Sequence, residues 1–133
     1  MNHVVYDTNI ASLAVRGRMP AALGARLFGA VEVLAFVTVG ELVKWSELRS
    51  WGQRQRGALD VWLGQRPVID STEEVSRTWG RLAASMQARG VPVSENDIWI
   101  AACCLSEGLP LVTRNVKDFV DFAEHHGLLL ITD

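Results

Sequence analysis

Five acidic or amide side chains stand just beyond apolar runs of the sequence or at the expected starts of helices. They are Asp7, Glu41, Asp97, Asn115 and Asp118. Two bare carboxylates about 4 Å apart repel by roughly 4 kcal/mol at an effective dielectric constant near 20. Several carboxylates that meet in a fold therefore need protons or a cation, and hard oxygen ligands suit Mg²⁺ or Mn²⁺. If the fold gathers these side chains, they predict a divalent-metal site.

Each of these residues also has an ordinary structural explanation. Asp7 is in position to cap the following helix, and Glu41 would favour a helix dipole, an effect of typically ~0.3–1 kcal/mol. Ser94 and Asp97 match a capping box, and the last two of the five residues are common in turns. Considered singly, each residue is explained better by its structural role than by metal binding. The metal site gains its support from four separate segments that send such side chains toward one end of a sheet, where helix N-termini would also help to keep the acids ionised.

Alternating apolar runs and helical spacings predict the elements that position these residues. Several runs are continuous and β-branched, as buried parallel strands tend to be. Ser71 and Glu74 predict a helix start by a capping box, and Gly90 predicts the end of that helix. The expected strands cover 4–6, 34–39, 66–70, 109–113 and 128–132, and the expected helices cover about 9–16, 20–30, 40–50, 51–64, 71–89, 94–105 and 117–125.

This order of elements predicts an α/β fold, a three-layer sandwich in which helices flank a mostly parallel sheet of about five strands. In such sheets, ligands bind beyond the carboxyl ends of the strands. Asp7 follows the first strand, and Asn115 follows the fourth. Glu41 is expected two residues past the second strand, in the first turn of a helix. The predicted fold therefore places the candidate residues at the end of the sheet where ligands bind.

Length and composition favour one globular domain, residues 1–133, that is 49% hydrophobic and 21% charged. The longest apolar stretch, "VLAFVTV" (33–39), is shorter than the about 20 residues that cross a bilayer, so no membrane is expected. No secretory signal is visible at the N-terminus. Cys103 and Cys104 are adjacent and make a poor disulfide framework, which favours a reduced, cytoplasmic protein.

Arginines and tryptophans are interleaved in the middle of a chain whose net charge is −2. Arginine can hold a phosphate backbone, and aromatic rings can stack on unpaired bases. The alternative is an amphipathic helix with tryptophans inside and arginines in water, and both hold if the arginine face borders an active site. The residues are Arg49, Arg54, Arg56 and Arg66, with Trp45, Trp51 and Trp62.

At the acidic residues the chain resembles the PIN-domain family, and within it the VapC toxins of bacterial toxin–antitoxin pairs. The resemblance rests on "YDTNI" (6–10), "VTVGELVKW" (37–45), "ENDIWIAACC" (95–104) and "LVTRNVKDF" (111–119). It implies a parallel sheet of about five strands flanked by helices. It also implies a Mg²⁺- or Mn²⁺-dependent endoribonuclease, a hydrolase that cuts RNA phosphodiesters with metal-activated water.

The resemblance assigns roles to individual residues. Asp7, Glu41 and Asp97 fall on the acidic metal-site positions of the family. Many relatives carry Asp where this chain has Asn115, which brings a carbonyl oxygen but no charge, so Asp118 is an alternative contributor. The resemblance is therefore compatible with a site that holds either one or two metal ions in this chain.

Further residues are expected to support the site. Thr8 and Asn9 would shape the loop around Asp7, and Thr113 would hydrogen-bond an acid or a metal-bound water. The RNA backbone is expected to contact Arg49, Arg54, Arg56, Arg114 and Lys117. Neutralising two or three arginines of the 49–66 stretch is expected to weaken RNA binding and flatten its salt dependence.

The family further implies a cognate antitoxin that blocks the site, and a homodimer. The segment 10–28 is apolar and Ala-rich, and it would bind an apolar antitoxin helix in a groove. The alternative is that this segment packs only against its own sheet.

Two other functions compete with the nuclease. One is a phosphoacceptor receiver domain that would use Asp70, which follows the third expected strand. The other is a catalytically inactive PIN-like protein that binds RNA or serves as a scaffold, having lost its chemistry at Asn115.

Overall fold

The computed structural model describes residues 2–133 and has at its centre a five-stranded sheet in the order β3-β2-β1-β4-β5. Every neighbouring pair of strands is parallel. The expected α/β fold with a mostly parallel sheet is therefore confirmed, with all pairs parallel. The strands are β1 (His3–Tyr6), β2 (Val31–Ala35), β3 (Val68–Ile69), β4 (Leu111–Val112) and β5 (Leu130–Ile131).

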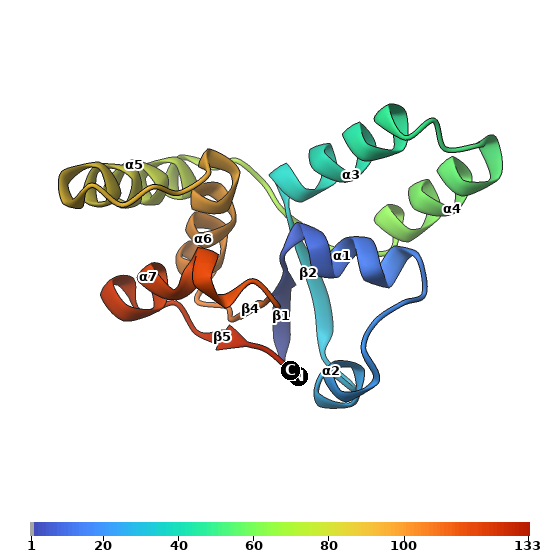
Figure 1. Cartoon of the computed structure of the whole chain (residues 1–133), viewed down its shortest axis with the longest axis horizontal. Helices are drawn as coiled ribbons and strands as arrows, with labels where there is room; N and C mark the ends of the chain where they lie inside the picture. The colour runs from blue at the N-terminus through green and yellow to red at the C-terminus, as the bar shows by residue number, and fades with distance from the viewer. Residues whose placement is uncertain (1) are drawn as a thin grey trace.

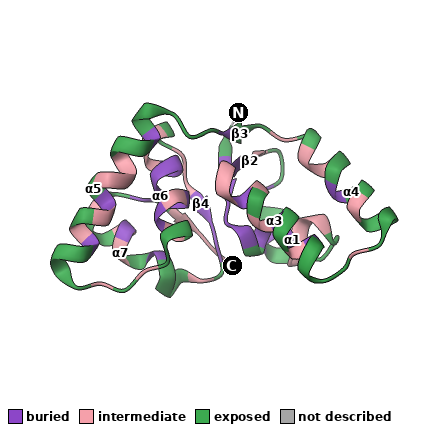
Figure 2. Cartoon of the chain, turned by 90° about the horizontal axis from the view of Figure 1, so that it is seen from above, coloured by how far each residue is buried: buried purple, intermediate pink, exposed green. Residues whose placement is uncertain are grey.

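Helices cover both faces of this sheet (Figure 1). One group, α5, α6 and α7, lies on one side, and α1, α3 and α4 lie on the other, as the view from above in Figure 2 also shows. None of the helices in the described residues is long and apolar enough to cross a membrane. Their bounds are α1 (Thr8–Val15), α2 (Ala21–Arg26), α3 (Phe36–Leu48), α4 (Gln53–Gly64), α5 (Glu73–Arg89), α6 (Glu95–Glu107) and α7 (Val116–His126).

The sheet separates two hydrophobic cores because alternate residues of a strand point to opposite faces. Val5 packs in the core that α5, α6 and α7 complete, together with residues such as Ile100 and Phe122. Val4 and Tyr6 pack in the other core, against α1, α2, α3 and α4. The strand β1 is thus buried on both faces, which explains its continuous apolar run.

The order of the strands reverses beside β1. The chain first adds β2 and β3 on one side of β1 and later returns to place β4 on the other side. Such a reversal opens a crevice at the carboxyl ends of the strands. The amide of Asp7 donates to the carbonyl oxygen of Val112 over 3.1 Å, so the residue that leaves β1 is tied to the end of β4.

The expected second strand, 34–39, is wrong in its second half, because β2 spans Val31–Ala35 and α3 begins at Phe36. Phe36 and Val37 pack into one core and Val39 packs into the other. A helix turn that packs against cores on both sides is apolar on both sides, and its short sequence cannot be told from a buried strand. Glu41 consequently lies in the second turn of α3, not in the first turn as expected.

Two further boundaries differ from the expectations. The helix α5 is capped by Thr72, whose hydroxyl accepts from the amide of Val75 over 3.2 Å, and not by Ser71. The helix expected over 20–30 is shorter, since α2 ends at Arg26 and Gly29 takes a positive φ of 82° that favours glycine. The other expected elements are present with ends that differ by a few residues.

A two-pronged ion pair joins α5 to α7. Arg89 donates to both carboxylate oxygens of Asp121 over 2.7 and 2.8 Å, and the guanidinium lowers the pKa of Asp121. A lowered pKa contributes stability above the unfolded pKa, which is lost as the pH falls through the folded pKa. We expect Asp121→Asn to lower the free energy of unfolding by about 0.5–1 kcal/mol at pH 7.

This difference between wild type and Asp121→Asn should shrink as the pH falls from 4 to 2. Denaturant unfolding at several pH values measures it. An unchanged difference at pH 2 would show that the pair does not stabilise through its charge.

Candidate active site

Asp7 is held at the end of β1 by groups from two other segments. One carboxylate oxygen, Oδ1, accepts from the amide of Ile10 over 2.8 Å and caps α1. The other, Oδ2, accepts from the hydroxyl of Thr113 over 2.6 Å, and that hydroxyl accepts from the amide of Asn115 over 3.0 Å. Asp7 and Thr113 are 3% and 0% exposed. The carboxylate is therefore fixed in place by the segment that follows β4.

Glu41 reaches the same region from the second turn of α3. Its Oε1 accepts from the hydroxyl of Thr8 over 2.7 Å, and Thr8 also lies 3.0 Å from the hydroxyl of Thr38. Both threonines are buried. Thr38 was not identified from the sequence, although it lies in the segment "VTVGELVKW" that carries the family resemblance. This pair of hydroxyls ties the start of α1 to α3 and orients the Glu41 side chain.

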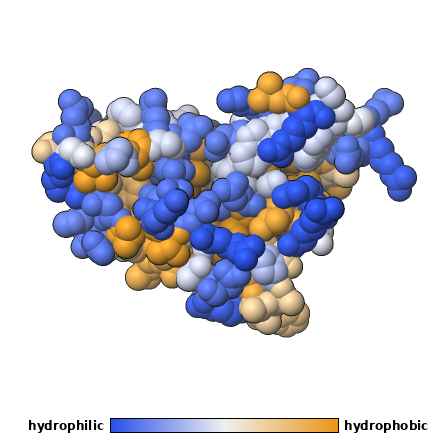
Figure 3. All heavy atoms as spheres, in the orientation of Figure 1, coloured by the Kyte–Doolittle hydropathy of each residue, from blue (hydrophilic) through white to orange (hydrophobic). Residues whose placement is uncertain are grey.

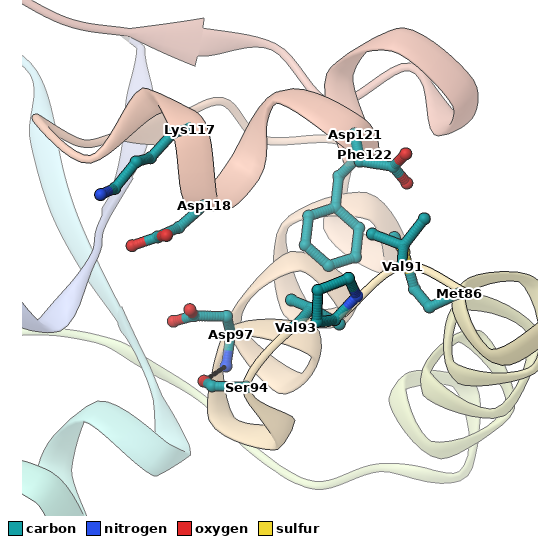
Figure 4. Close-up of a pocket in the computed structure, with 10 residues that line it drawn as sticks. Met86, Val91, Val93, Ser94, Asp97, Lys117, Asp118, Asp121 and Phe122 are labelled. Atoms are coloured by element: carbon teal, nitrogen blue, oxygen red, sulfur yellow. Dashed lines mark hydrogen bonds between the residues drawn. The ribbon is translucent and has the colours of Figure 1, made fainter. Parts of the chain in front are cut away.

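Asp97 and Asp118 each stand in the first turn of a helix, α6 and α7 respectively. The hydroxyl of Ser94 accepts from the amide of Asp97 over 3.1 Å, so Ser94 caps α6. Figure 4 shows the carboxylates of Asp97 and Asp118 directed into the same space. Asp118 is exposed, whereas Asp97 is partly buried. The two first turns thus present a pair of acids across from each other.

All four carboxylates border one small pocket at the switch point of the sheet, with a volume of about 140 Å³. We refer to it as the acid pocket. Asn115 also borders it, so the structure gathers all five candidates that open the sequence analysis. Thr8 and Asn9 line it too, as does Trp45, which was not expected there. The acids come from four segments: Asp7, Glu41, Asp97 and Asp118.

Burial and mutual repulsion disfavour ionisation of two of these acids. Desolvation by burial raises the pKa of Asp7, against the hydrogen bonds from Thr113 and Ile10. Desolvation also raises the pKa of Asp97 to about 6, with repulsion from the other three acids added to it. These two causes outweigh the hydrogen bonds to the two carboxyl groups, which favour the ionised form.

The donor set of the acid pocket fits a hydrated Mg²⁺ or Mn²⁺. Within residues 2–133, no three Asp, Glu, His or Cys side chains converge closely enough to form a ready-made metal site. Mg²⁺, however, usually keeps several waters and is bound through one or two carboxylates together with substrate phosphates. Hard oxygens that face one small pocket match this mode of binding.

The residues expected to contact RNA lie in three different places. Arg49 and Arg114 line a hollow beside the acid pocket, and Lys117 lines another hollow on its far side. Arg54 and Arg56 lie on α4, where Arg56 forms an ion pair with Glu47. The structure therefore divides the expected basic stretch into residues near the acids and residues away from them.

The remaining members of the basic stretch are structural. Arg66 bonds to Glu32 over 2.9 Å and stacks on Trp62, with its Cζ 3.9 Å from the ring centroid. Trp45, Trp51 and Trp62 pack against the core on the α1 side of the sheet. The amphipathic-helix alternative thus describes the tryptophans correctly, while Arg49 faces the region beside the acids.

The PIN domain family matches residues 4–125 of the chain, which include every residue of the acid pocket. The chain belongs to the PIN-domain family. The resemblance expected from the sequence is therefore confirmed, and the receiver-domain alternative is wrong. Asp70, on which that alternative depended, is an exposed residue outside the acid pocket.

Relatives within the family carry the VapC name. The chain is 28% identical to ribonuclease VapC1 of Haemophilus influenzae (strain R2866) over 85% of its length and 87% of that protein. Its fold is that of VapBC2 from Rickettsia felis bound to a DNA fragment, with a TM-score of 0.82, 21% identity and 98% of each chain covered. It is also that of VapBC-5, a member of the VapBC family of toxin–antitoxin systems from Mycobacterium tuberculosis, with a TM-score of 0.74, 23% identity and 100% of each chain covered.

Proposed function

We propose that this chain is a divalent-metal-dependent endoribonuclease and the toxin of a toxin–antitoxin pair. The observation that carries the proposal is the acid pocket, in which four carboxylates from separate segments of a PIN domain face one small space. The ribonuclease name of a relative that matches 85% of the chain supports RNA as the substrate. The adjacent cysteines are free and buried, which suits the cytoplasm, where we place its action.

Asp7, Glu41 and Asp97 are the residues we assign to holding the metal, and Asn115 or Asp118 completes the set. A bound Mg²⁺ or Mn²⁺ would supply an activated water and would stabilise the charge that develops on the phosphodiester. The chain's own part is to orient the acids through Thr113 and Thr8. These buried hydroxyls prevent the carboxylates from turning away from the pocket.

The test is cleavage of RNA by the purified chain with and without a divalent cation. We expect cleavage with Mg²⁺ or Mn²⁺, its loss when the cation is chelated, and its return when the cation is added back. Asp7→Asn should remove the activity while isothermal titration shows weaker Mn²⁺ uptake. Equal cleavage by wild type and Asp7→Asn would indicate a contaminating nuclease and would sink the proposal.

Total cellular RNA is the appropriate substrate for this assay, because the RNA that is cut is not defined by the acid pocket. Sequencing of the new RNA ends then gives the cleavage site. The same experiment on cells that express the chain locates the substrate in its natural setting.

A second candidate function is RNA binding without cleavage, and the presence of Asn115 favours it. An amide at this position gives the pocket one negative charge fewer than an ionised acid would. The variant Asn115→Asp discriminates between the two functions. If the wild-type chain cuts RNA, the inactive alternative is excluded, whereas activity in Asn115→Asp alone would establish it.

The antitoxin and the homodimer belong to the same proposal. Segment 10–28 packs largely within its own domain, because Ile10, Leu23 and Leu27 are buried in the core. The most exposed large apolar side chains of the described residues are Phe28 (92%), Leu48 (71%), Leu129 (68%) and Val61 (63%). Phe28 belongs to this segment, so we assign antitoxin binding to the surface around it. Mass measurement of the chain alone and with its antitoxin gives both assembly states.

A further inference from the structure

A second hollow adjoins the acid pocket on the side of α1 and α3, with a volume of about 520 Å³. It shares Asn9, Trp45 and Asn115 with the acid pocket, so the two spaces are continuous. Three arginines from separate segments line it, and we name it the Arg hollow after them. They are Arg16, which follows α1, Arg49, which follows α3, and Arg114, which follows β4.

The Arg hollow lacks the carboxylates that would neutralise it. None of the described residues that line it is acidic. Arg114 pairs with Asp133 over 3.3 Å, but both side chains are exposed enough that water competes for this contact. Three cationic groups in one hollow, of which Arg114 has this exposed acidic partner, favour the binding of an anion.

Two of the arginines are held in orientations that leave nitrogens available. The Nε of Arg16 donates to the carbonyl oxygen of Ser12 over 3.2 Å, which leaves its terminal nitrogens for another partner. Arg49 lies over the ring of Trp45, with its Cζ 5.1 Å from the ring centroid. A guanidinium that is positioned in this way matches a phosphate with two parallel hydrogen bonds.

The far side of the acid pocket has a different chemistry. The hollow there has a volume of about 510 Å³ and shares Asp97 and Asp118 with the acid pocket. Figure 4 shows its apolar wall, formed by side chains such as Val93 and Phe122, and Lys117 is its cationic residue. The positive charge around the acids is thus concentrated on the α1 side.

The face in Figure 3 is largely hydrophilic, and its outline dips between the two groups of helices. A single strand of RNA that places one phosphate at the acids must place a neighbouring phosphate to one side of them. Only one side of the acid pocket, among the hollows described above, presents three arginines. We infer that the Arg hollow binds a backbone phosphate of the RNA strand adjacent to the phosphate that is cut, an inference that rests on the proposed ribonuclease function.

Arg16 is the residue that this inference adds. From the sequence alone it has no role beyond a place in an Ala-rich segment, because it stands far in the chain from Arg49 and Arg114. The fold brings the three together where α1, α3 and the segment after β4 meet. The inference also removes Arg54 and Arg56 from the RNA contact, since α4 contributes no residue to the described lining of this hollow.

The experiment measures binding of a fluorescein-labelled single-stranded RNA of 20 nucleotides by anisotropy at several KCl concentrations with Mg²⁺ present. The parent for all variants is the full chain with Asp97→Asn, so that the probe is not cut during the measurement. We expect Arg16→Gln to weaken binding by roughly 3–10-fold and to reduce the slope of log K against log salt by about 0.7, the value for one phosphate contact in a single strand.

Four comparison variants make the result specific. Arg77→Gln removes the same charge from an exposed position on α5 and should leave the slope unchanged. Arg16→Lys keeps the charge and should restore most of the slope, which a purely structural role would not do. Arg54→Gln and Arg56→Gln should leave the slope unchanged as well. Arg16 is exposed, and thermal unfolding verifies that each variant folds.

Several results overturn the inference. One is an unchanged slope in Arg16→Gln. Another is a slope that falls in Arg54→Gln or Arg56→Gln but not in Arg16→Gln. A third is RNA binding by the parent chain that does not depend on salt. Weaker binding of an antitoxin by Arg16→Gln with normal RNA binding would assign the Arg hollow to the protein partner instead. Cleavage by the wild-type chain is assayed separately, so the ribonuclease proposal stands or falls on its own measurement.

Discussion

Replacing Asp97 by Asn is expected to lower RNA cleavage by roughly 10²–10³-fold while leaving the fold nearly as stable as before. The amide has the size of the carboxylate but brings no negative charge to the acid pocket. Ser94 still caps α6, because its hydroxyl bonds to the backbone amide of residue 97 and not to the side chain that changes.

The stability of Asp97→Asn should equal that of the wild type or exceed it slightly when no divalent cation is present. The raised pKa of Asp97, about 6, shows that its charged form is disfavoured by burial and by neighbouring acids. Removal of the charge relieves both the desolvation and the repulsion. A residue whose main role is to cap a helix would instead stabilise the fold, and its replacement by Ala would lower the free energy of unfolding by about 1 kcal/mol.

Two measurements decide the matter for Asp97→Asn, namely the initial rate of RNA cleavage with Mg²⁺ and the free energy of unfolding in chelator. Asp60→Asn is the matched control, because Asp60 is an exposed acid on α4 outside the acid pocket. It should leave both quantities unchanged. Retained cleavage together with a large loss of unfolding free energy would show that the role of Asp97 is purely structural.

Thr113→Val is expected to damage both stability and activity through a single hydroxyl. Valine fills nearly the same volume but cannot donate to Asp7 or accept from the amide of Asn115. Both the hydroxyl and the Asp7 carboxylate are buried, so the change leaves polar groups without partners. Such a loss costs about 1–3 kcal/mol of unfolding free energy.

The activity of Thr113→Val should fall by roughly 10–100-fold, the range seen when a partner that orients a metal ligand is removed. Thr113 also opposes the rise in the pKa of Asp7, so the variant should make Asp7 harder to ionise. Thr113→Ser keeps the hydroxyl and should recover most of the activity. Thr78→Val removes a less buried hydroxyl that bonds to the carbonyl oxygen of Glu74, and it should change stability by less than about 0.5 kcal/mol.

Cleavage rates and denaturant unfolding of these three threonine variants test the assignment. If Thr113→Val matched Thr78→Val in both measurements, the buried hydroxyl would have no part in holding Asp7.

The sequence predicted most of the sheet because a strand buried on both faces has a continuous apolar run. This is true of β1 and, at its end, of β2. The same property made the start of α3 indistinguishable from a strand, since Phe36, Val37 and Val39 pack into cores on both sides. Periodicity does not identify a helix where its apolar residues pack into cores on both sides.

The candidate acids could be found from the sequence because each stands near the start of a helix or beyond a strand, where side chains meet at one edge of a parallel sheet. The charge environment could not be found in this way. The pKa of Asp97 depends on how deeply the residue is buried and on acids from three other segments. Arg16 and Thr38 were missed because their partners are distant in the chain and no local pattern marks them.

The position of β4 sets the moment during synthesis at which this protein can acquire its activity. The strand lies beside β1, yet it is made only after α6. A nascent chain that ends before residue 111 lacks Thr113, Asn115 and Asp118, so Asp7 has neither its hydroxyl partner nor its opposing acid. Because the domain folds as a unit, a ribosome is not exposed to a working nuclease until it has translated the segment that carries these three residues.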